Sequence, residues 1–271
     1  YGELLSSADV LDGNLLGRVY RIYDTAGVLT NDQFDFKGNL SKVKRKVFSD
    51  IALTMDWSGI ETQTSITAVD AFVVQWAIDN GDLDDEDFEI ETEYDALNRV
   101  TELTPPDTSH VLYTYNEASL LETVQVRVRG AATATDFVTG VSYNARGQRE
   151  SIAYANHTST AYEYDPERFR LTNLVTSRAA MSPHGAATLQ DLSFTYDPVG
   201  NITAIADAAQ GTLFFANTQV SPDATFTYDA IYRLTQATGR EKVGLSQTTH
   251  ADPSYGDLPD ATVTALRNYT Q

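Results

Sequence analysis

The chain has 271 residues, 42% of them hydrophobic, with no cysteine and a formal net charge of −19. The absence of cysteine excludes a zinc–cysteine site, a disulfide framework and a cysteine nucleophile, so stability must come from packing. The excess of acidic residues argues against a nucleic-acid backbone or an anionic membrane surface as the partner. The longest nearly apolar run, residues 71–78, is too short to span a bilayer.

One short phrase, an aromatic residue followed by Asp or Asn, recurs along the chain. Its copies are IYDTAGV (22–28), QFDFKGN (33–39), EYDALNR (93–99), TYNEASL (114–120), SYNARGQ (142–148), EYDPERF (163–169), FTYDPVGN (194–201) and TYDAIYR (227–233). Alternate residues before the Asp or Asn share one face of a strand. The Asp or Asn side chain can accept a backbone hydrogen bond and start a turn, and a following glycine suits the positive φ that such a turn often needs. Each copy therefore predicts a β-hairpin.

The spacing of the copies indicates how the hairpins are joined. Tyr94 and Tyr115 are 21 residues apart, as are Tyr143 and Tyr164, while the other steps from Tyr94 onward are 28 or 32 residues. A fixed step of about 40 residues would suggest propeller blades, and the series has none. Because a single hairpin is marginal in water, we expect an all-β fold in which antiparallel hairpins stack into one long ribbon. The loops on its far side should differ in length.

Residues 54–90 interrupt the repeats as an insertion that contains both tryptophans, Trp57 and Trp76. Its apolar residues fit either a buried strand or a short helix, and the pattern leaves both open. We expect any helix of this chain within residues 60–80. No linker divides the sequence into independent domains, so residues 1–271 are expected to form one repeat unit with this insertion.

The acid-rich segment at residues 79–95 is expected to form a solvated loop. Asp82, Asp84 and Glu86 alternate as in a calcium-binding loop, but the glycine and the distal glutamate of an EF-hand are missing. Calcium binding is therefore the alternative interpretation. A basic run contains Lys42, Lys44, Arg45 and Lys46. We interpret it as a charged strand face, and the alternative is that it pairs with the acidic segment.

Two further segments, 176–190 and 245–264, are rich in small residues and turn formers and are expected to be loops. Four asparagines begin N-x-Ser/Thr sequons: Asn39, Asn156, Asn201 and Asn268. Glycosylation is one interpretation of such a motif. Asn39 and Asn201 directly follow turn glycines, however, and we interpret these sequons as turn chemistry.

No set of residues forms a convincing active site. The histidines are isolated, with neither metal-ligand spacing nor a nucleophile motif beside them: His110, His157, His184 and His250. No glycine loop for phosphate is present, and the repeated aspartates already have a role in turns. The sequence thus predicts a protein that is not an enzyme, with no catalytic, cofactor-binding or metal-binding residue and no cofactor.

The repeated Tyr-Asp-x-x-Gly-Arg/Asn-Leu/Ile pattern resembles YD repeats, also called Rhs repeats. Longer phrases resemble the B component, or a B–C fusion, of bacterial insecticidal toxin complexes (Tc toxins). They are NLLGRVYRIYDTAGVLTNDQFDFKGNL (14–40), YDALNRVTELTPPDTSHVLYTYNEASLLETV (94–124), LQDLSFTYDPVGNITAIADAAQ (189–210) and FTYDAIYRLTQATGRE (226–241). The resemblance covers nearly the whole chain.

The resemblance implies a spiral β-sheet that closes as a hollow shell. Such a shell holds a variable C-terminal toxic domain, unfolded, until a pore-forming A component delivers it into a target cell. No self-cleavage module, cargo domain or docking propeller is visible in this chain. We therefore expect residues 1–271 to be a piece of shell wall, incomplete at both ends and secreted. Its implied partners are the remainder of the shell, the toxin cargo and the A component, without nucleic acid or direct membrane insertion.

Two alternatives remain open at this stage. Carbohydrate-binding surface repeats also use aromatic hairpins, although they carry tryptophan in nearly every repeat. Teneurin-like adhesion proteins share the YD shell. The exposure of the repeat tyrosines distinguishes a shell wall from a ligand-binding surface. Tyr115, Tyr164, Tyr196 and Tyr228 should pack between neighbouring hairpins in a wall, and they should be exposed in a row if they stack on a ligand.

Overall fold

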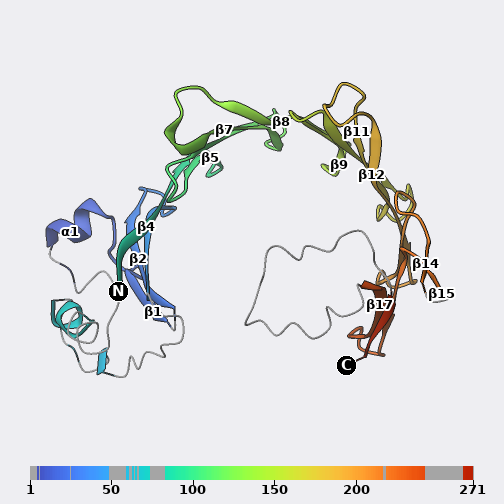
Figure 1. Cartoon of the computed structure of the whole chain (residues 1–271). Coiled ribbons are helices and arrows are strands. Elements are labelled where there is room, and N and C mark those ends of the chain that lie inside the picture. The colour runs from blue at the N-terminus through green and yellow to red at the C-terminus, as the bar shows by residue number, and fades with distance from the viewer. Residues whose placement is uncertain are drawn as a thin grey trace. The chain divides into compact units, whose positions relative to one another are not determined.

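The computed structural model describes residues 5, 7–24, 26–48, 59–60, 63, 65, 67–73, 83–215, 218–241 and 265–270. These residues are mostly antiparallel β-sheet, which confirms the predicted all-β class (Figure 1). The chain divides into two compact units, residues 1–137 and 138–271. Each is built from hairpins that follow one another along the sequence.

The first unit begins with a short helix and continues with strands that each pair with the next. The elements are α1 (Ser7–Asp12), β1 (Arg21–Asp24), β2 (Gly27–Phe34), β3 (Leu40–Phe48), β4 (Leu83–Tyr94), β5 (Val100–Thr104), β6 (His110–Tyr115), β7 (Leu121–Arg127) and the 3-10 turn η3 (Val128–Gly130). Every pairing from β1 to β7 is antiparallel. This is the stacked ribbon that the spacing of the repeats predicts.

The second unit repeats the arrangement, with one small side hairpin. Its strands are β8 (Thr135–Tyr143, which crosses the boundary at residue 137), β9 (Arg149–Tyr154), β10 (Thr158–Tyr164), β11 (Leu171–Arg178), β12 (Ala187–Tyr196), β13 (Ile202–Asp207), β14 (Leu213–Phe215), β15 (Thr218–Val220), β16 (Ala224–Tyr228), β17 (Leu234–Glu241) and β18 (Ala265–Thr270). β14 and β15 pair only with each other, and β13 continues directly to β16.

The predicted loop at 176–190 is wrong at both ends, because β11 extends to Arg178 and β12 begins at Ala187. Its small and β-branched residues pair across these strands, so only residues 179–186 connect them. Most of the predicted loop at 245–264 lies outside the described residues.

Because successive strands are antiparallel, the turns alternate between two edges of the ribbon in each unit. The repeat turns share one edge, which we call the YD edge; they span 35–39, 95–99 and 116–120 in the first unit and 144–148, 165–170, 197–201 and 229–233 in the second. The connections on the opposite edge, the far edge, vary in length. The 21-residue steps have short connections (105–109 and 155–157), and a 32-residue step has residues 179–186. The prediction of unequal far-side loops is confirmed.

The first copy of the phrase, IYDTAGV, differs from the others. Asp24 pairs directly with Gly27, so the turn between β1 and β2 contains only two residues. This turn and the turn at 35–39 stand at opposite ends of β2, which places IYDTAGV on the far edge. The copy still forms the predicted hairpin, because Asp24 accepts the N–H of Ala26 (2.8 Å) and Gly27 has a positive φ of 136°. Only its edge differs from that of the other copies.

The ribbon has two chemically different faces in each unit. One, the tyrosine face, carries apolar pairs such as Tyr113 opposite Val124 and Phe194 opposite Ile205. The other, the polar face, carries pairs such as Lys44 opposite Glu89. Hydroxyl groups also pair across strands on the polar face: Thr114 with Thr123 (2.7 Å), Ser142 with Ser151 (2.8 Å) and Thr225 with Thr238 (2.8 Å). The alternation of residue types along each strand produces this division.

Part of the insertion packs against the polar face of β1 and β2. Residues 67–73 are helical, which confirms the helix expected within 60–80. Val69 and Val73 of this helix are buried against Val28 of β2, with Tyr23, Ile60 and Phe72 packed around them. Val28 stands opposite Lys46 on the polar face. The helical segment 67–73 thus adds a second layer over the polar face of β1 and β2. Trp57 and Trp76 lie outside the described residues.

Candidate functional site

The YD edge is where the repeated residues meet, and the turn at Asp95 illustrates its construction. One carboxylate oxygen of Asp95 accepts the N–H groups of Leu97 (2.7 Å) and Arg99 (3.0 Å), and the other accepts from the Arg99 guanidinium (2.7 Å). The Asp95 N–H donates to the Arg99 carbonyl, which closes the turn. Asn98, just before the end of the turn, has a φ of 62°, a conformation that asparagine tolerates.

Other YD turns repeat this bonding. The corresponding acceptor side chains are Asp35, Asn116, Asn144, Asp197 and Asp229. The positive φ falls on Gly38, Ser119, Gly147, Gly200 and Tyr232 in these turns. The turn at Asp165 is one residue longer, so its positive φ falls on Phe169. The prediction of Asp- and Asn-initiated turns is confirmed.

Two of the sequon asparagines act in these turns as predicted. Asn39 Nδ2 donates to Asp35 and Asn201 Nδ2 donates to Asp197, at 2.8 and 2.7 Å. On the far edge, Asn156 accepts from Thr158. The side chain of Asn268 lies outside the described part of the structure.

Hydrogen bonding to the turn carboxylates stabilises their charged form. The backbone N–H of Arg99 does most to hold the pKa of Asp95 below its ordinary value of 3.8; burial opposes this, and the Arg99 guanidinium adds to the lowering. The backbone N–H and side chain of Arg233 lower the pKa of Asp229 in the same way. The repeat aspartates are therefore committed to their turns as anions. A carboxylate held in this way is poorly suited to act as a general base.

In five of the repeats the tyrosine joins its hairpin to the hairpin before it. Its hydroxyl donates to a backbone carbonyl at the start of the preceding hairpin's second strand. These bonds run from Tyr94 to Leu40 (3.1 Å), Tyr115 to Val100 (2.7 Å), Tyr164 to Arg149 (2.9 Å), Tyr196 to Leu171 (2.7 Å) and Tyr228 to Ile202 (2.8 Å). We call this contact the tyrosine latch. All five tyrosines are half-buried, which confirms that they pack between hairpins and gives no support to an exposed ligand-stacking row.

Arginines just before the latch acceptor strengthen the same junction. Arg99 lies over the ring of Tyr115, 4.5 Å from its centroid, and Arg170 lies over Tyr196 at 5.5 Å. The Arg170 guanidinium also donates to the carbonyl of Asp197 in the next turn (3.0 Å). Burial raises the pKa of both tyrosine hydroxyls, so they remain neutral donors. The sequence analysis did not identify these arginines. Each is the last residue of its turn, and this shared position in the repeat is the signal that could have identified them.

The basic run of β3 forms an ion-pair ladder with β4 on the polar face. Lys42 contacts Glu89 (2.6 Å) and Glu91 (2.8 Å), and Lys44 contacts Asp32 of β2 (2.6 Å). Hydrogen bonds that Lys42 donates to Glu89 and Glu91 raise its pKa. The prediction of an acidic loop at 79–95 is therefore wrong from residue 83 onward. The basic run lies on a strand as interpreted, and it also pairs with the acidic segment, as the alternative had it. Opposite charges on adjacent strands stabilise such pairing.

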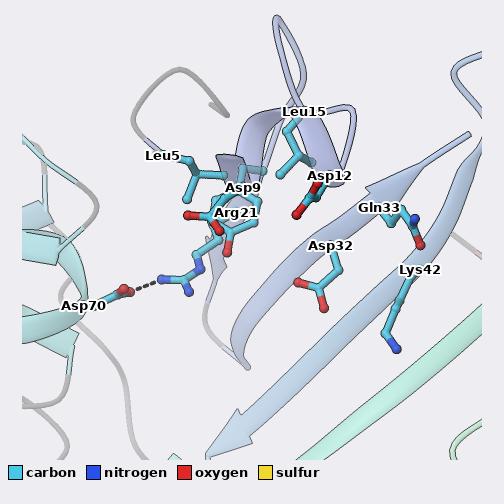
Figure 2. Close-up of a pocket in the computed structure, with 11 residues that line it drawn as sticks. Leu5, Asp9, Asp12, Leu15, Arg21, Asp32, Gln33, Lys42 and Asp70 are labelled. Atoms are coloured by element: carbon cyan, nitrogen blue, oxygen red, sulfur yellow. Dashed lines mark hydrogen bonds and ion pairs between the residues drawn. The ribbon is translucent and has the colours of Figure 1, made fainter. Parts of the chain in front are cut away.

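One hollow of the first unit lies between α1, β1–β3 and the helical segment 67–73, with a volume of about 580 Å³. Figure 2 shows Asp9 and Asp12 of α1 among the residues that line it, with the guanidinium of Arg21 paired with Asp70. The other charged groups lining it are paired in the ladder just described. The hollow is therefore a polar junction between the insertion and the ribbon. The described residues that line it include no Ser, Thr, Cys or His to act as nucleophile or base.

The histidines and acids considered as sites do not come together. His110 Nδ1 lies 2.5 Å from Glu102 on the polar face, whereas His157 and His184 stand in separate far-edge connections. His250 and the side chains of Asp82, Asp84 and Glu86 lie outside the described residues. Among the residues that are described, no group of three or more His, Asp or Glu side chains could hold a metal ion.

Comparison with known proteins gives consistent matches. Toxin subunit YenC2 of Yersinia entomophaga is 30% identical over 244 residues, which are 89% of this chain and 24% of that protein. Toxin subunit YenC1 of the same organism is 34% identical over 156 residues, 57% of this chain and 16% of that protein. The chain thus spans about a quarter or less of these relatives. No protein-family model matches it.

Solved structures agree with the sequence matches. The crystal structure of TcdB2-TccC3 covers 97% of this chain with a TM-score of 0.67 and 30% identity, and the match is 12% of that chain. A Photorhabdus luminescens Tc holotoxin pore structure covers 90% with a TM-score of 0.64 and 30% identity, and the match is 10% of that chain.

The latched hairpins and these matches define the chain as a YD-repeat, or Rhs-repeat, protein. More particularly, it is a YD-repeat protein of the kind found in the B and C components of Tc toxins. Its relatives are Tc toxin subunits with Rhs-repeat shell architecture.

Proposed function

We propose that this chain is a stretch of wall in a hollow Rhs-repeat shell, which encloses and protects a C-terminal toxic domain before delivery into a target cell. The observation that carries this proposal is the tyrosine latch. It joins five of the hairpins to the preceding one at the YD edge, so neighbouring hairpins within each unit form a continuous surface. The similarity to Tc toxin subunits supports the same role. Residues 1–271 act throughout as wall, with 54–90 as an insertion.

The proposed partners follow from this role. They are the remaining shell of the same subunit, its toxin cargo and the pore-forming A component, and the site of action is extracellular after secretion. The net charge of −19 makes nucleic acid an unsuitable partner. Within the described residues, no helix has the length and apolar character needed to cross a bilayer. The role requires no catalytic, cofactor-binding or metal-binding residue in this chain. The turn aspartates already accept hydrogen bonds within their own turns.

Protease protection tests the proposal in the complete subunit that carries this chain. A substitution of two latch tyrosines, Tyr196→Phe with Tyr228→Phe, weakens the wall without removing a ring. The toxic domain should survive protease in the wild type and be cleaved faster in this variant. Tyr162→Phe, on the same face but outside the latches, should behave as the wild type. A toxic domain that is cleaved equally fast in all three proteins would contradict the proposal.

A further inference from the structure

The structure separates one N-x-Ser/Thr sequon from the others. Asn156, in the far-edge turn between β9 and β10, is exposed, whereas Asn39 and Asn201 are half-buried in YD turns. The Nδ2 atoms of Asn39 and Asn201 donate to their turn aspartates at 2.8 and 2.7 Å. The described residues contain no hydrogen bond from the Nδ2 atom of Asn156, whose side chain accepts through Oδ1. Among the sequons whose side chains are described, Asn156 thus has the exposed amide nitrogen that the turn does not use.

The hydroxyl groups of these sequons also differ in what they contact. Thr158 Oγ1 donates to Asn156 Oδ1 at 2.6 Å, and the N–H of Thr158 donates to the same oxygen at 3.1 Å. In the other two sequons, the hydroxyls of Ser41 and Thr203 donate to backbone carbonyls of the neighbouring strand, at 3.1 and 3.3 Å. In the described structure, therefore, the sequon of Asn156 is the one whose hydroxyl bonds to its own asparagine.

These two bonds to Oδ1 affect the reactivity of the Asn156 amide. A carboxamide nitrogen is a poor nucleophile because its lone pair is delocalised onto the carbonyl oxygen. It becomes nucleophilic when it loses a proton, and the negative charge then lies largely on that oxygen. Hydrogen bonds to a charged group favour its charged form, and a neighbouring group that favours the deprotonated form is a general way to activate a nucleophile. The folded turn therefore prepares Asn156 for reaction at Nδ2.

The turn holds Asn156 in a fixed and accessible position. His157 has a φ of 65°, and its N–H donates to the Tyr154 carbonyl at 3.2 Å, which closes the turn. The His157 carbonyl accepts the N–H of Ala179 (2.8 Å), so the turn is also tied to the next far-edge connection. Asn156 and His157 are both exposed at the tip. Exposed loop tips are the parts of a fold that enzymes reach most readily.

We propose that Asn156 is an N-glycosylation site of the folded chain and that its sugar donor is a nucleotide-activated hexose. Asn156 Nδ2 forms a bond to the anomeric carbon of the hexose as the bond between that carbon and the diphosphate oxygen breaks. The nucleoside diphosphate leaves with the electron pair, and the Nδ2 proton passes to a base of the glycosyltransferase. Asn39 and Asn201 stay unmodified, because their amide nitrogens are bonded within the YD turns. This modification is independent of the proposed wall function, and either can hold without the other.

A soluble N-glycosyltransferase that accepts N-x-Ser/Thr peptides, supplied with UDP-glucose, tests this site. Its substrate is the folded full chain with Asn268→Gln, so that only the sequons with described side chains compete. Intact mass measures each added hexose, and mass spectrometry of peptides locates it. A complete protease digest of the same chain is treated in parallel, because digestion removes the influence of the fold. The matched control is the folded chain with Asn156→Gln in the same background.

The folded chain should gain the mass of one hexose, located on Asn156, and the Asn156→Gln variant should gain none. In the digest, hexose should also appear on the peptides of Asn39 and Asn201, because their amide nitrogens are then released from the turns. Equal modification of Asn39 or Asn201 in the folded chain would overturn the proposal, as would an unmodified Asn156. Hexose on Asn156 alone in the digest would overturn it too, because the local sequence and not the fold would then select the site.

Discussion

The substitution Tyr196→Phe examines the tyrosine latch with the smallest change that can break it. The variant loses the hydroxyl that donates to the Leu171 carbonyl at 2.7 Å. The ring remains, so its packing beside Phe194 and beneath Arg170 is unchanged. The free energy of unfolding should fall by about 1 kcal/mol, the net value of an ordinary intramolecular hydrogen bond. Because Leu171 is only half-buried, water can reach its carbonyl and keep the loss from becoming larger.

Urea unfolding of the full chain, followed by circular dichroism, measures this loss. The two units can unfold separately, so the matched control lies in the same unit. Tyr162→Phe removes a hydroxyl from the same face, one for which the described structure contains no hydrogen bond. It should leave the transition of the second unit almost unchanged. Equal shifts for Tyr162→Phe and Tyr196→Phe, or no shift for Tyr196→Phe, would refute the latch.

The effect should accumulate along the ribbon. Latches on adjacent hairpins are roughly 10 Å apart, a distance at which stability changes are nearly additive. Replacement of all five latch tyrosines by phenylalanine should therefore cost about 2 kcal/mol in the first unit, which holds two of them, and about 3 kcal/mol in the second, which holds three. Each loss is a large fraction of the stability of a small domain, so both units should unfold at clearly lower urea concentrations although the hydrophobic composition is almost unchanged.

Three further outcomes follow from the turns and the ladder. Gly200→Val should lower the free energy of unfolding by about 1–2 kcal/mol, because φ is 112° there; an equal loss for Gly239→Val, where a side chain meets open space, would contradict this. Stability should be constant above about pH 5 and fall as pH drops through 3.8 and below, because Asp95 and Asp229 have lowered pKa values in the folded state; an acid titration showing no loss down to pH 2 would contradict it. Lys42→Met should cost less than about 1 kcal/mol, and urea midpoints in high salt should show a smaller difference.

The hairpins could be predicted from the sequence because their signals are local. An Asp or Asn and a residue with positive φ fix each turn, and alternation fixes the face of the preceding aromatic residue. The latch could be predicted only in part. The half-burial of Tyr115 and Tyr196 follows from their position, but their acceptors are backbone carbonyls of another hairpin. Every residue type has a backbone carbonyl, so the sequence does not reveal which residue accepts the bond from the tyrosine.

The acidic strand shows a different reason for failure. Phe88 and Ile90 alternate with Glu89 and Glu91 in β4, which is the pattern of a strand. The density of negative charge favoured a solvated loop when the segment was considered alone. Its stability as a strand depends on Lys42 and Lys44 of β3, which are about 45 residues earlier in the sequence. An analysis of residues 79–95 alone could not include the attraction between these lysines and the acidic residues of β4.

The pairing of each strand with its sequence neighbour also bears on biosynthesis. Short-range pairings form with little loop-closure cost, so hairpins can be added one by one as the chain leaves the ribosome, beginning at the N-terminus. This order is interrupted between β3 and β4, where residues 49–82 must be made before the next strand is available. During that pause β3 is an open edge. It carries Lys42, Lys44 and Lys46, and lysines on an edge strand prevent it from pairing with a wrong strand. The same lysines later form ion pairs with the acidic residues of β4.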